Sequence, residues 1–185
     1  MQQILITGAS GLLGVNVALE AAKDHQVTGI SNSLVLNAQA IRSSKFHLIK
    51  QDLLAPGAVE RLLDQVQPDW VIHCAALANL EACEANPELA RQLNSDLPAK
   101  LAANVARGGA RFLHVSTDAV FDGQTGDYTE SDRPNPLSVY ARTKLQGEYA
   151  VADANPQAII ARVNLFGWSL TGKRSLAEQF FYNLS

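Results

Sequence analysis

The segment SVYARTKLQGE, residues 138–148, places a tyrosine and a lysine four positions apart, Tyr140 and Lys144. On a helix, residues i and i+4 lie on the same face, so the phenol and the ammonium would be neighbours. A phenol with a pKa of about 10 is a poor acid–base catalyst at neutral pH, and a nearby ammonium stabilises the phenolate and lowers that pKa. The pair is therefore either an ordinary surface pair or the proton-handling part of an active site.

Three glycines near the start of the chain, Gly8, Gly11 and Gly14, follow an apolar run at 2–8 and open a helical pattern at 11–23. This context is typical of a dinucleotide-binding turn. The first glycine allows the tight turn, the second lets a pyrophosphate approach the backbone, and the third lets helix and strand pack closely. The free N–H groups of the helix start favour phosphate. An ordinary glycine-rich turn is the alternative.

The end of the second predicted strand, at residues 25–31, indicates which dinucleotide is preferred. An acid at this place hydrogen-bonds the 2′-hydroxyl of NAD and repels the 2′-phosphate of NADP. The sequence has Ser31, Asn32 and Ser33 here and no carboxylate. The absence favours NADP(H) over NAD(H) without settling the choice.

Three charged residues are further candidates for the cofactor. Arg42 or Lys45 would reach the 2′-phosphate, or each is a solvated surface charge. Asp52 lies at the end of the predicted strand at 46–53. It would either accept a hydrogen bond from the adenine amino group or cap the next turn.

The apolar run ARFLHVST, residues 110–117, ends in two hydroxyl side chains, Ser116 and Thr117, and Asp118 follows. Such a run predicts a buried strand whose carboxyl end lies where open α/β folds bind their ligands. We expect Thr117 to hold a substrate carbonyl there while Tyr140 donates its proton and the nicotinamide delivers hydride. A Tyr-x-x-x-Lys pair alone proves little, but together with the glycine turn it predicts reductase chemistry.

The remaining pattern alternates strands with helices, which predicts an α/β fold with a doubly wound, Rossmann-like parallel sheet in a three-layer αβα arrangement. No repeat or linker interrupts it, so we expect one NAD(P)-binding domain over 1–185. The predicted strands are 2–8, 25–31, 46–53, 68–76, 110–117 and 158–166, and the predicted helices include 11–23, 56–66, 87–107 and the segment that carries Tyr140.

The composition excludes several classes of protein. With 47% hydrophobic and 18% charged residues, the 185-residue chain is globular and long enough for one good core. A net charge of -3 gives no electrostatic reason to expect nucleic acid or an anionic membrane as partner. Apolar runs are too short to span a bilayer and no secretory signal follows Met1, so we expect a cytoplasmic protein.

The other reactive residue types have plainer interpretations. Cys74 and Cys83 show no metal-ligand spacing, so we expect no metal and two reduced thiols, with Cys74 packed as a small hydrophobe or near the nicotinamide. His73 and His114 lie inside strand patterns and are expected to be packed or hydrogen-bonded rather than catalytic. A solvated helix face is expected to carry Glu81, Glu84 and Glu88.

At the glycine turn and at Thr117, Tyr140 and Lys144, the chain resembles the extended short-chain dehydrogenase/reductases. VSTDAVFDG (115–123), the Y.E.D.P.P pattern (128–136) and YARTKLQGE (140–148) together resemble the dTDP-4-dehydrorhamnose reductase group of sugar-nucleotide reductases. VIHCAAL (71–77) is similar to the family's strand bearing Asn-Ala-Ala. RQLNSDLPAKLA is similar to its next long helix, with Asn94 at the family's asparagine position.

The resemblance implies a catalytic set of Thr117, Tyr140 and Lys144, with Tyr140 as the acid and Lys144 also binding the nicotinamide ribose. The reaction would reduce the 4-keto group of a deoxysugar attached to a nucleoside diphosphate. A homodimer would pair through the helices of Tyr140 and Asn94. The sugar nucleotide would be faced by Asp118, Val120 and Asn164. The cofactor would be lined by Gly8, Ser10, Gly11, Leu12, Leu13, Gly14, Ser31, Asn32, Asp52, Leu53, Cys74, Ala75, Ala76, Tyr140 and Lys144.

Three features depart from the family pattern. The second predicted strand lacks the acid that many relatives have at its end. ARVNLFGW, residues 161–168, matches the family's sixth-strand segment only loosely. Family members continue past position 185 into a smaller C-terminal region that clamps the substrate nucleotide, whereas this chain stops inside a helical pattern at 175–185. It is either naturally short or a fragment of a longer chain. Two alternative functions stay open: an NAD-dependent nucleotide-sugar epimerase or dehydratase, and a non-catalytic NADP-binding regulatory subunit.

Overall fold

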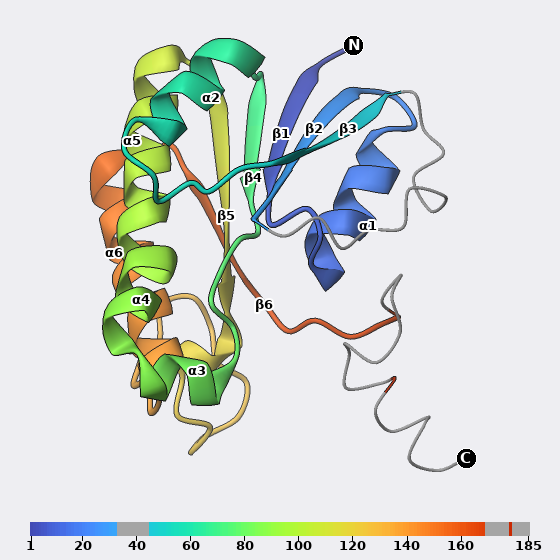
Figure 1. Ribbon diagram of the computed structural model, residues 1–185. Helices are drawn as coiled ribbons and strands as arrows, with labels where there is room; N and C mark the ends of the chain where they lie inside the picture. The colour runs from blue at the N-terminus through green and yellow to red at the C-terminus, as the bar shows by residue number, and fades with distance from the viewer. Residues whose placement is uncertain (33–44, 169–177, 179–185) are drawn as a thin grey trace. The chain divides into compact units, whose positions relative to one another are not determined.

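The computed structural model describes residues 1–32, 45–168 and 178 (Figure 1). The chain divides into two compact units. The first is made of Met1–Ala75 and Leu165–Ser185, and the second of Ala76–Asn164. The helical pattern expected at 175–185 lies outside the described residues, apart from Glu178.

The first unit is built on four parallel strands in the order β3-β2-β1-β4. They are β1 (Gln3–Thr7), β2 (Gln26–Ser31), β3 (Phe46–Lys50) and β4 (Trp70–His73). Because β1 has a neighbour on each side and apolar residues along its length, its last four residues are buried. The register places Thr7 opposite His73 on β4.

The helices of the first unit include α1 (Leu12–Ala21) and α2 (Ala58–Val66). Figure 1 shows α1, in blue, beside the sheet, and it packs against β1 and β2. The core beneath it includes Ile6, Ala18 and Phe46. The helix α1 therefore starts directly after the glycine turn and stays in contact with the strand that precedes the turn.

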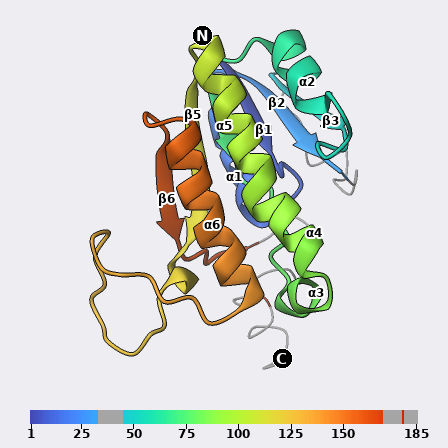
Figure 2. The same ribbon diagram turned by 90° about the vertical axis from the view of Figure 1, so that its left-hand side faces the viewer.

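The second unit pairs β5 (Arg111–Thr117) in parallel with β6 (Ile159–Val163). Its helices include α3 (Leu80–Ala85) and α6 (Val139–Ala154), and a short 3-10 helix, η3 (Asp118–Val120), follows β5. Figure 2 shows α6, in orange, lying along α5 (Leu97–Gly108), with which it is in contact. The helix α6 also packs on β5, which brings the Tyr140 helix against the strand that ends in Thr117.

The helix predicted over 87–107 is present but is not uniformly α-helical. It consists of α4 (Pro87–Arg91), a π-helical segment η2 (Gln92–Asp96) and α5 (Leu97–Gly108). Pro98 has no N–H, so the carbonyl of Asn94 lacks its usual partner four residues on. That carbonyl instead approaches Gly147 of α6 so closely that a side chain there would collide with it. The helix ends at Gly108, and its C-cap Gly109 has a φ of 75°, in the left-handed region.

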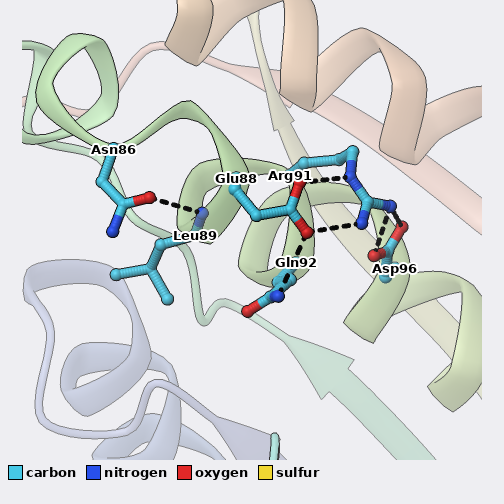
Figure 3. A network of polar contacts seen from close by, with 6 residues as sticks. All are labelled: Asn86, Glu88, Leu89, Arg91, Gln92 and Asp96. Carbon is cyan, nitrogen blue, oxygen red and sulfur yellow. Dashed lines mark hydrogen bonds and ion pairs between the residues drawn. The ribbon is translucent and has the colours of Figure 1, made fainter.

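A network of exposed charges joins α4 to the π-helical segment (Figure 3). The Arg91 guanidinium donates to Glu88 at 2.8 Å and to Asp96 at 2.6 Å. Its hydrogen bond to Glu88 holds the pKa of that carboxyl below its ordinary value. Asn86 caps α4 by accepting from Leu89 N at 3.1 Å. Glu88 is exposed and lies on a solvated face, as predicted. Exposed ion pairs of this kind contribute little to stability.

The predicted strands are all present among the described residues, and several are shorter than expected. β3 ends at Lys50, β4 at His73 and β6 at Val163. Both cysteines are free thiols. In the part of the chain that the structure describes, no helix is long and apolar enough to cross a membrane.

Candidate active site

The glycine turn in the first unit has the geometry that its sequence predicts. Gly8 has a φ of +67°, and a Cβ placed on it would lie 2.7 Å from the backbone nitrogen of Ala75. The end of β1 therefore touches the chain just after β4, which only a residue without a side chain permits. Gly11 N donates to Gly8 O at 2.9 Å, and a Cβ on Gly14 would collide with Gly8 O.

The start of α1 is suited to an anion. Its N-cap is Gly11, with no side-chain cap, and its first turn contains no acidic residue. The first N–H groups of a helix have no intrahelical acceptor and carry a partial positive charge. The turn and the helix start together therefore form a backbone cradle that fits a pyrophosphate.

Two predicted residues at the end of β2 have different surroundings. Ser31 is 4% exposed, and its hydroxyl lies 2.6 Å from that of Ser10 in the glycine turn. Asn32 is exposed. This arrangement leaves Asn32 as the more accessible of the two, while Ser33 and Arg42 lie outside the described residues.

The suggestion that Lys45 reaches a 2′-phosphate is wrong. Lys45 precedes β3 and therefore lies at the amino end of the strand, whereas ligands bind at the carboxyl ends. Its ammonium donates to Lys23 O at 2.9 Å. Asp52 lies at the correct end, and its carboxylate accepts from Leu54 N at 2.9 Å. The turn-capping alternative for Asp52 is therefore observed, beside a buried Leu53.

The residues around β4 form a buried polar pair. The Thr7 hydroxyl lies 2.6 Å from Nδ1 of His73, and both residues are fully buried. Thr7 also accepts from Ala75 N at 3.3 Å. His73 is thus a packed, hydrogen-bonded histidine, as predicted. Cys74 is half-buried and Ala76 is exposed.

Leu12 and Leu13 of the predicted cofactor set line a cavity of about 210 Å³ at the start of α1. The other lining residues are Asn16 and the segment 165–168. The wall is largely apolar and includes an exposed Trp168.

In the second unit the structure brings Thr117 and Tyr140 together. The Thr117 hydroxyl lies near enough to the Tyr140 phenol to lower its pKa, and Tyr140 is half-buried. The same hydroxyl donates to the Asp118 carboxylate at 3.3 Å. Thr117 ends β5 and caps η3 by accepting from Ala119 N at 3.2 Å. Tyr140 is the second residue of α6, whose N-cap is Ser138. A strand end and a helix start thus place the two hydroxyls in contact.

The pKa of Tyr140 differs from the expectation. Burial is the largest influence and raises the pKa of the phenol above its ordinary value, while the Thr117 hydrogen bond lowers it. Lys144 was expected to lower this pKa. Its ammonium is 2% exposed and donates to Val115 O at 2.6 Å, and it lies 3.4 Å from Nε2 of His114. In this structure Lys144 is therefore held by the backbone of β5.

The predicted substrate residues are only partly brought together. Asn164 donates to the Asp118 carboxylate at 3.1 Å, and both residues are exposed. Val120 is fully buried, so the prediction that its side chain faces a substrate is wrong. The side chain packs in the core, and its carbonyl accepts from Asn135 N at 2.9 Å.

Sequence reasoning missed a buried ion pair that supports the site. Glu148, 4% exposed, accepts from Arg162 at 2.7 Å and from the Ser116 hydroxyl at 2.5 Å. The hydrogen bond to Glu148 raises the pKa of Arg162, whose guanidinium lies 5.0 Å from the ring centre of Phe121. The pair ties α6 to β5 and β6. Only Glu148 lay in a recognised motif, and nothing in the spacing named its partner.

Sequence reasoning also did not predict the hydrogen bonds that Asn94 and Glu84 make to distant parts of the second unit. The Asn94 side chain is fully buried and holds Leu77 and Thr143. Glu84, expected on a solvated face, accepts from Val139 N at 2.8 Å at the start of α6.

In the described ranges, no cluster of three or more His, Cys, Asp or Glu residues could hold a metal ion.

Residues 1–177 match the family model described as the RmlD substrate binding domain. The chain belongs to this family. The match confirms the resemblance to the dTDP-4-dehydrorhamnose reductase group that the motifs around Thr117 and Tyr140 predicted.

Curated relatives include members with different names. A probable low-salt glycan biosynthesis reductase of Haloferax volcanii is 41% identical over 86% of this chain and 52% of its own length. The dTDP-4-dehydrorhamnose reductase of Mycobacterium tuberculosis is 37% identical over 92% of this chain and 51% of its own. The β subunit of methionine adenosyltransferase 2 from Bos taurus is 36% identical over 88% and 46%. The chain thus spans about half the length of the curated relatives that it matches.

Solved structures support the fold. A dTDP-4-dehydrorhamnose reductase of Bacillus anthracis in complex with NADP has a TM-score of 0.70 at 25% identity, over 87% of this chain and 52% of that one. A UDP-glucuronic acid 4-epimerase of Bacillus cereus in complex with NAD has a TM-score of 0.80 at 25% identity, over 90% and 58%. The predicted Rossmann-like α/β fold with parallel strands is confirmed.

Proposed function

We propose that the full-length protein is an NADP(H)-dependent reductase of a 4-keto group on a nucleotide-linked deoxysugar. The observation that carries this proposal is the closeness of the Tyr140 and Thr117 side chains at the end of β5, with Lys144 one turn further along α6. Family membership and the reductase names of two relatives support the reaction class.

The dinucleotide would be held by the first unit. Gly8 permits the close contact with Ala75 that shapes the turn, and the uncapped start of α1 offers free N–H groups to a pyrophosphate. Asn32 and the absence of a carboxylate at the end of β2 favour NADP(H) over NAD(H). When bound, the cofactor supplies the hydride.

The protein's own groups would handle the proton. Because burial raises its pKa, the Tyr140 phenol stays protonated at neutral pH, which is the state required of an acid. Thr117 would hold the carbonyl oxygen while Tyr140 donates its proton to that oxygen, so the carbonyl becomes a hydroxyl. The Lys144 ammonium would stabilise the phenolate left behind and bind the nicotinamide ribose. Asp118 and Asn164 would contact the sugar nucleotide.

The test is Tyr140→Phe in the full-length protein, with Tyr149→Phe as the matched control. Tyr149 lies on the same helix and is 60% exposed. NADPH oxidation is measured with a dTDP-linked 4-keto-6-deoxysugar. Tyr140→Phe should lower kcat by about 10²- to 10⁴-fold and leave the NADPH Kd unchanged, because only the proton donor is removed. Equal activity of the two variants would refute the proposal.

A second candidate is a non-catalytic NADP-binding subunit, which the likeness to the methionine adenosyltransferase 2 β subunit favours. Tight NADPH binding without turnover of any keto sugar would support it. An NAD-dependent epimerase or dehydratase is the third possibility, favoured by the likeness to the NAD-bound epimerase. Co-purification of oxidised NAD that does not exchange would support that reading.

We also propose a cytoplasmic homodimer paired through α5 and α6. The outer face of α6 supports this, since Arg142 and Gln146 lie one turn apart and are both exposed. Light scattering of the full-length protein tests the mass, and a charge introduced at Gln146 should produce monomers.

A further inference from the structure

The start of α6 is held by two acceptors of different origin. The Ser138 hydroxyl, at the N-cap, accepts from Ala141 N at 3.1 Å. The first helical N–H, that of Val139, donates to the carboxylate of Glu84 at 2.8 Å, and Glu84 is 55 residues away in the sequence. Tyr140 lies between these two hydrogen-bonded positions. The backbone on both sides of the tyrosine is thus fixed, once locally and once by a distant element.

The helix that presents Glu84 is itself anchored. The helix α3 is capped by Asn79, which accepts from Ala82 N at 2.7 Å. The thiol of Cys83, the residue before Glu84, is fully buried and donates to Leu77 O at 3.2 Å. Leu77 is in turn held by the Asn94 side chain. The Glu84 carboxylate is therefore an acceptor at the end of a short, fixed support.

A carboxylate is also the favoured group at this place. Helix starts carry a partial positive charge, and a charged acceptor makes a shorter and stronger hydrogen bond than a neutral one. The first turn of α6 has no acidic residue of its own. Glu84 supplies from outside the negative charge that the helix sequence lacks.

We infer that Glu84 is a positioning residue, which fixes where α6 begins and thereby keeps the Tyr140 hydroxyl in contact with Thr117. The inference rests on the proposed function, since it gives Glu84 a role in that reaction. Thr117 belongs to β5, so its distance from Tyr140 depends on the placement of α6 against that strand. A displacement of about 1 Å in a catalytic group can cost about 10²-fold in rate.

The experiment compares three variants of the full-length protein. Glu84→Ala removes the acceptor, Glu84→Gln keeps an acceptor oxygen without the charge, and Glu81→Ala removes an exposed carboxylate from the same helix. The first readout is kcat and KM for NADPH and the keto sugar. The second is the pH titration of the Tyr140 ring followed by carbon-13 NMR, assigned with Tyr140→Phe, which requires no turnover.

Glu84→Ala should lower kcat about tenfold and change both KM values less than about twofold, because binding groups are untouched. Glu84→Gln should keep most of kcat, and Glu81→Ala should resemble the unmodified protein. In the NMR titration, Glu84→Ala should move the Tyr140 midpoint down toward its ordinary value, since a displaced ring is less buried. Cys83 and Asp118, which also raise this pKa, are unchanged in every variant.

The inference fails if Glu84→Ala matches Glu81→Ala in kcat and in the Tyr140 midpoint. If Glu84→Gln loses as much kcat as Glu84→Ala and moves the Tyr140 midpoint equally, the negative charge of Glu84 holds the helix start, which also supports the inference. If the unmodified protein reduces no keto sugar, the proposed function fails, and the NMR titration alone decides whether Glu84 positions Tyr140.

Discussion

The side chain of Asn94 binds the backbone of Leu77 with both of its polar atoms. Leu77 N donates to Oδ1 at 2.8 Å, and Nδ2 donates to Leu77 O at 3.0 Å. Nδ2 also donates to the Thr143 hydroxyl at 3.1 Å, and that hydroxyl donates to Tyr140 O. One fully buried amide therefore links the segment before α3 to the helix that carries the proposed acid.

Replacing Asn94 by Leu should destabilise the protein by about 2–4 kcal/mol, because buried polar groups of Leu77 and Thr143 lose their partner. Urea unfolding measures the change. Asn104→Ala is the control, since its amide makes a hydrogen bond to Lys100 O within the same helix, and it should cost less than about 1 kcal/mol. A loss at Asn94 no larger than the control would show that the three hydrogen bonds contribute little.

Alanine substitutions at two glycines of the turn should have different effects, one mainly on NADPH binding and the other mainly on stability. A Cβ on Gly11, whose φ is -77°, would meet Gly8 O at 3.2 Å, so Gly11→Ala should cost less than about 1 kcal/mol. It should still weaken NADPH binding at least about tenfold, because the new methyl group lies on the phosphate cradle. Gly14→Ala, whose Cβ would collide with Gly8 O, should instead cost about 2 kcal/mol or more.

Isothermal titration with NADPH and thermal unfolding of the same two full-length variants check this pair of outcomes. Unchanged NADPH affinity in a folded Gly11→Ala protein would place the pyrophosphate somewhere other than the turn.

The loop after η3 should respond to acid through Asp122. Hydrogen bonds from Tyr128, Asn135 and Gln124 N lower the pKa of the Asp122 carboxyl to about 2. Because this lies below the unfolded value of about 3.9, the stabilisation is complete above that value and is lost as the pH falls toward 2. The NMR signal of the Tyr128 ring, which stacks on Phe121 at 4.4 Å, reports the change.

Asp122→Asn should remove this acid step from the Tyr128 signal, whereas Asp153→Asn on the surface of α6 should keep it. Asp132 has a lowered pKa in the same loop, mainly through its hydrogen bond from Thr129 N, so some acid response should persist in the first variant. An unaltered step in Asp122→Asn would assign the whole response to Asp132.

Much of the fold could be predicted because its signals are local. A buried parallel strand is a run of apolar residues, and a helix repeats every 3.6 residues, so both can be recognised within a dozen positions. The glycine turn is equally local, since Gly8, Gly11 and Gly14 occupy one strand–turn–helix segment. The i and i+4 relationship of Tyr140 and Lys144 also follows from the chain alone.

The π-helical segment before Pro98 could not be predicted from the local sequence. Proline was visible in the sequence, but the π-helical segment forms because the freed Asn94 carbonyl finds room against Gly147 of another helix. Val120 was misassigned for a related reason. The family resemblance placed it with the substrate residues, whereas the 3-10 helix turns its side chain into the core.

By itself, the sequence determined the order of strands and helices along the chain and the glycine turn, and it predicted Thr117, Tyr140 and Lys144 as a candidate catalytic set through the family resemblance. Only the tertiary structure decided the distant partners of the groups on α6. Lys144 donates to Val115 O, the first N–H of the helix donates to Glu84, and Glu148 pairs with Arg162. The physical reason is that periodicity and turn chemistry act over a few residues. Hydrogen-bond and ion-pair partners are chosen by proximity after folding, across separations that leave no pattern in the chain.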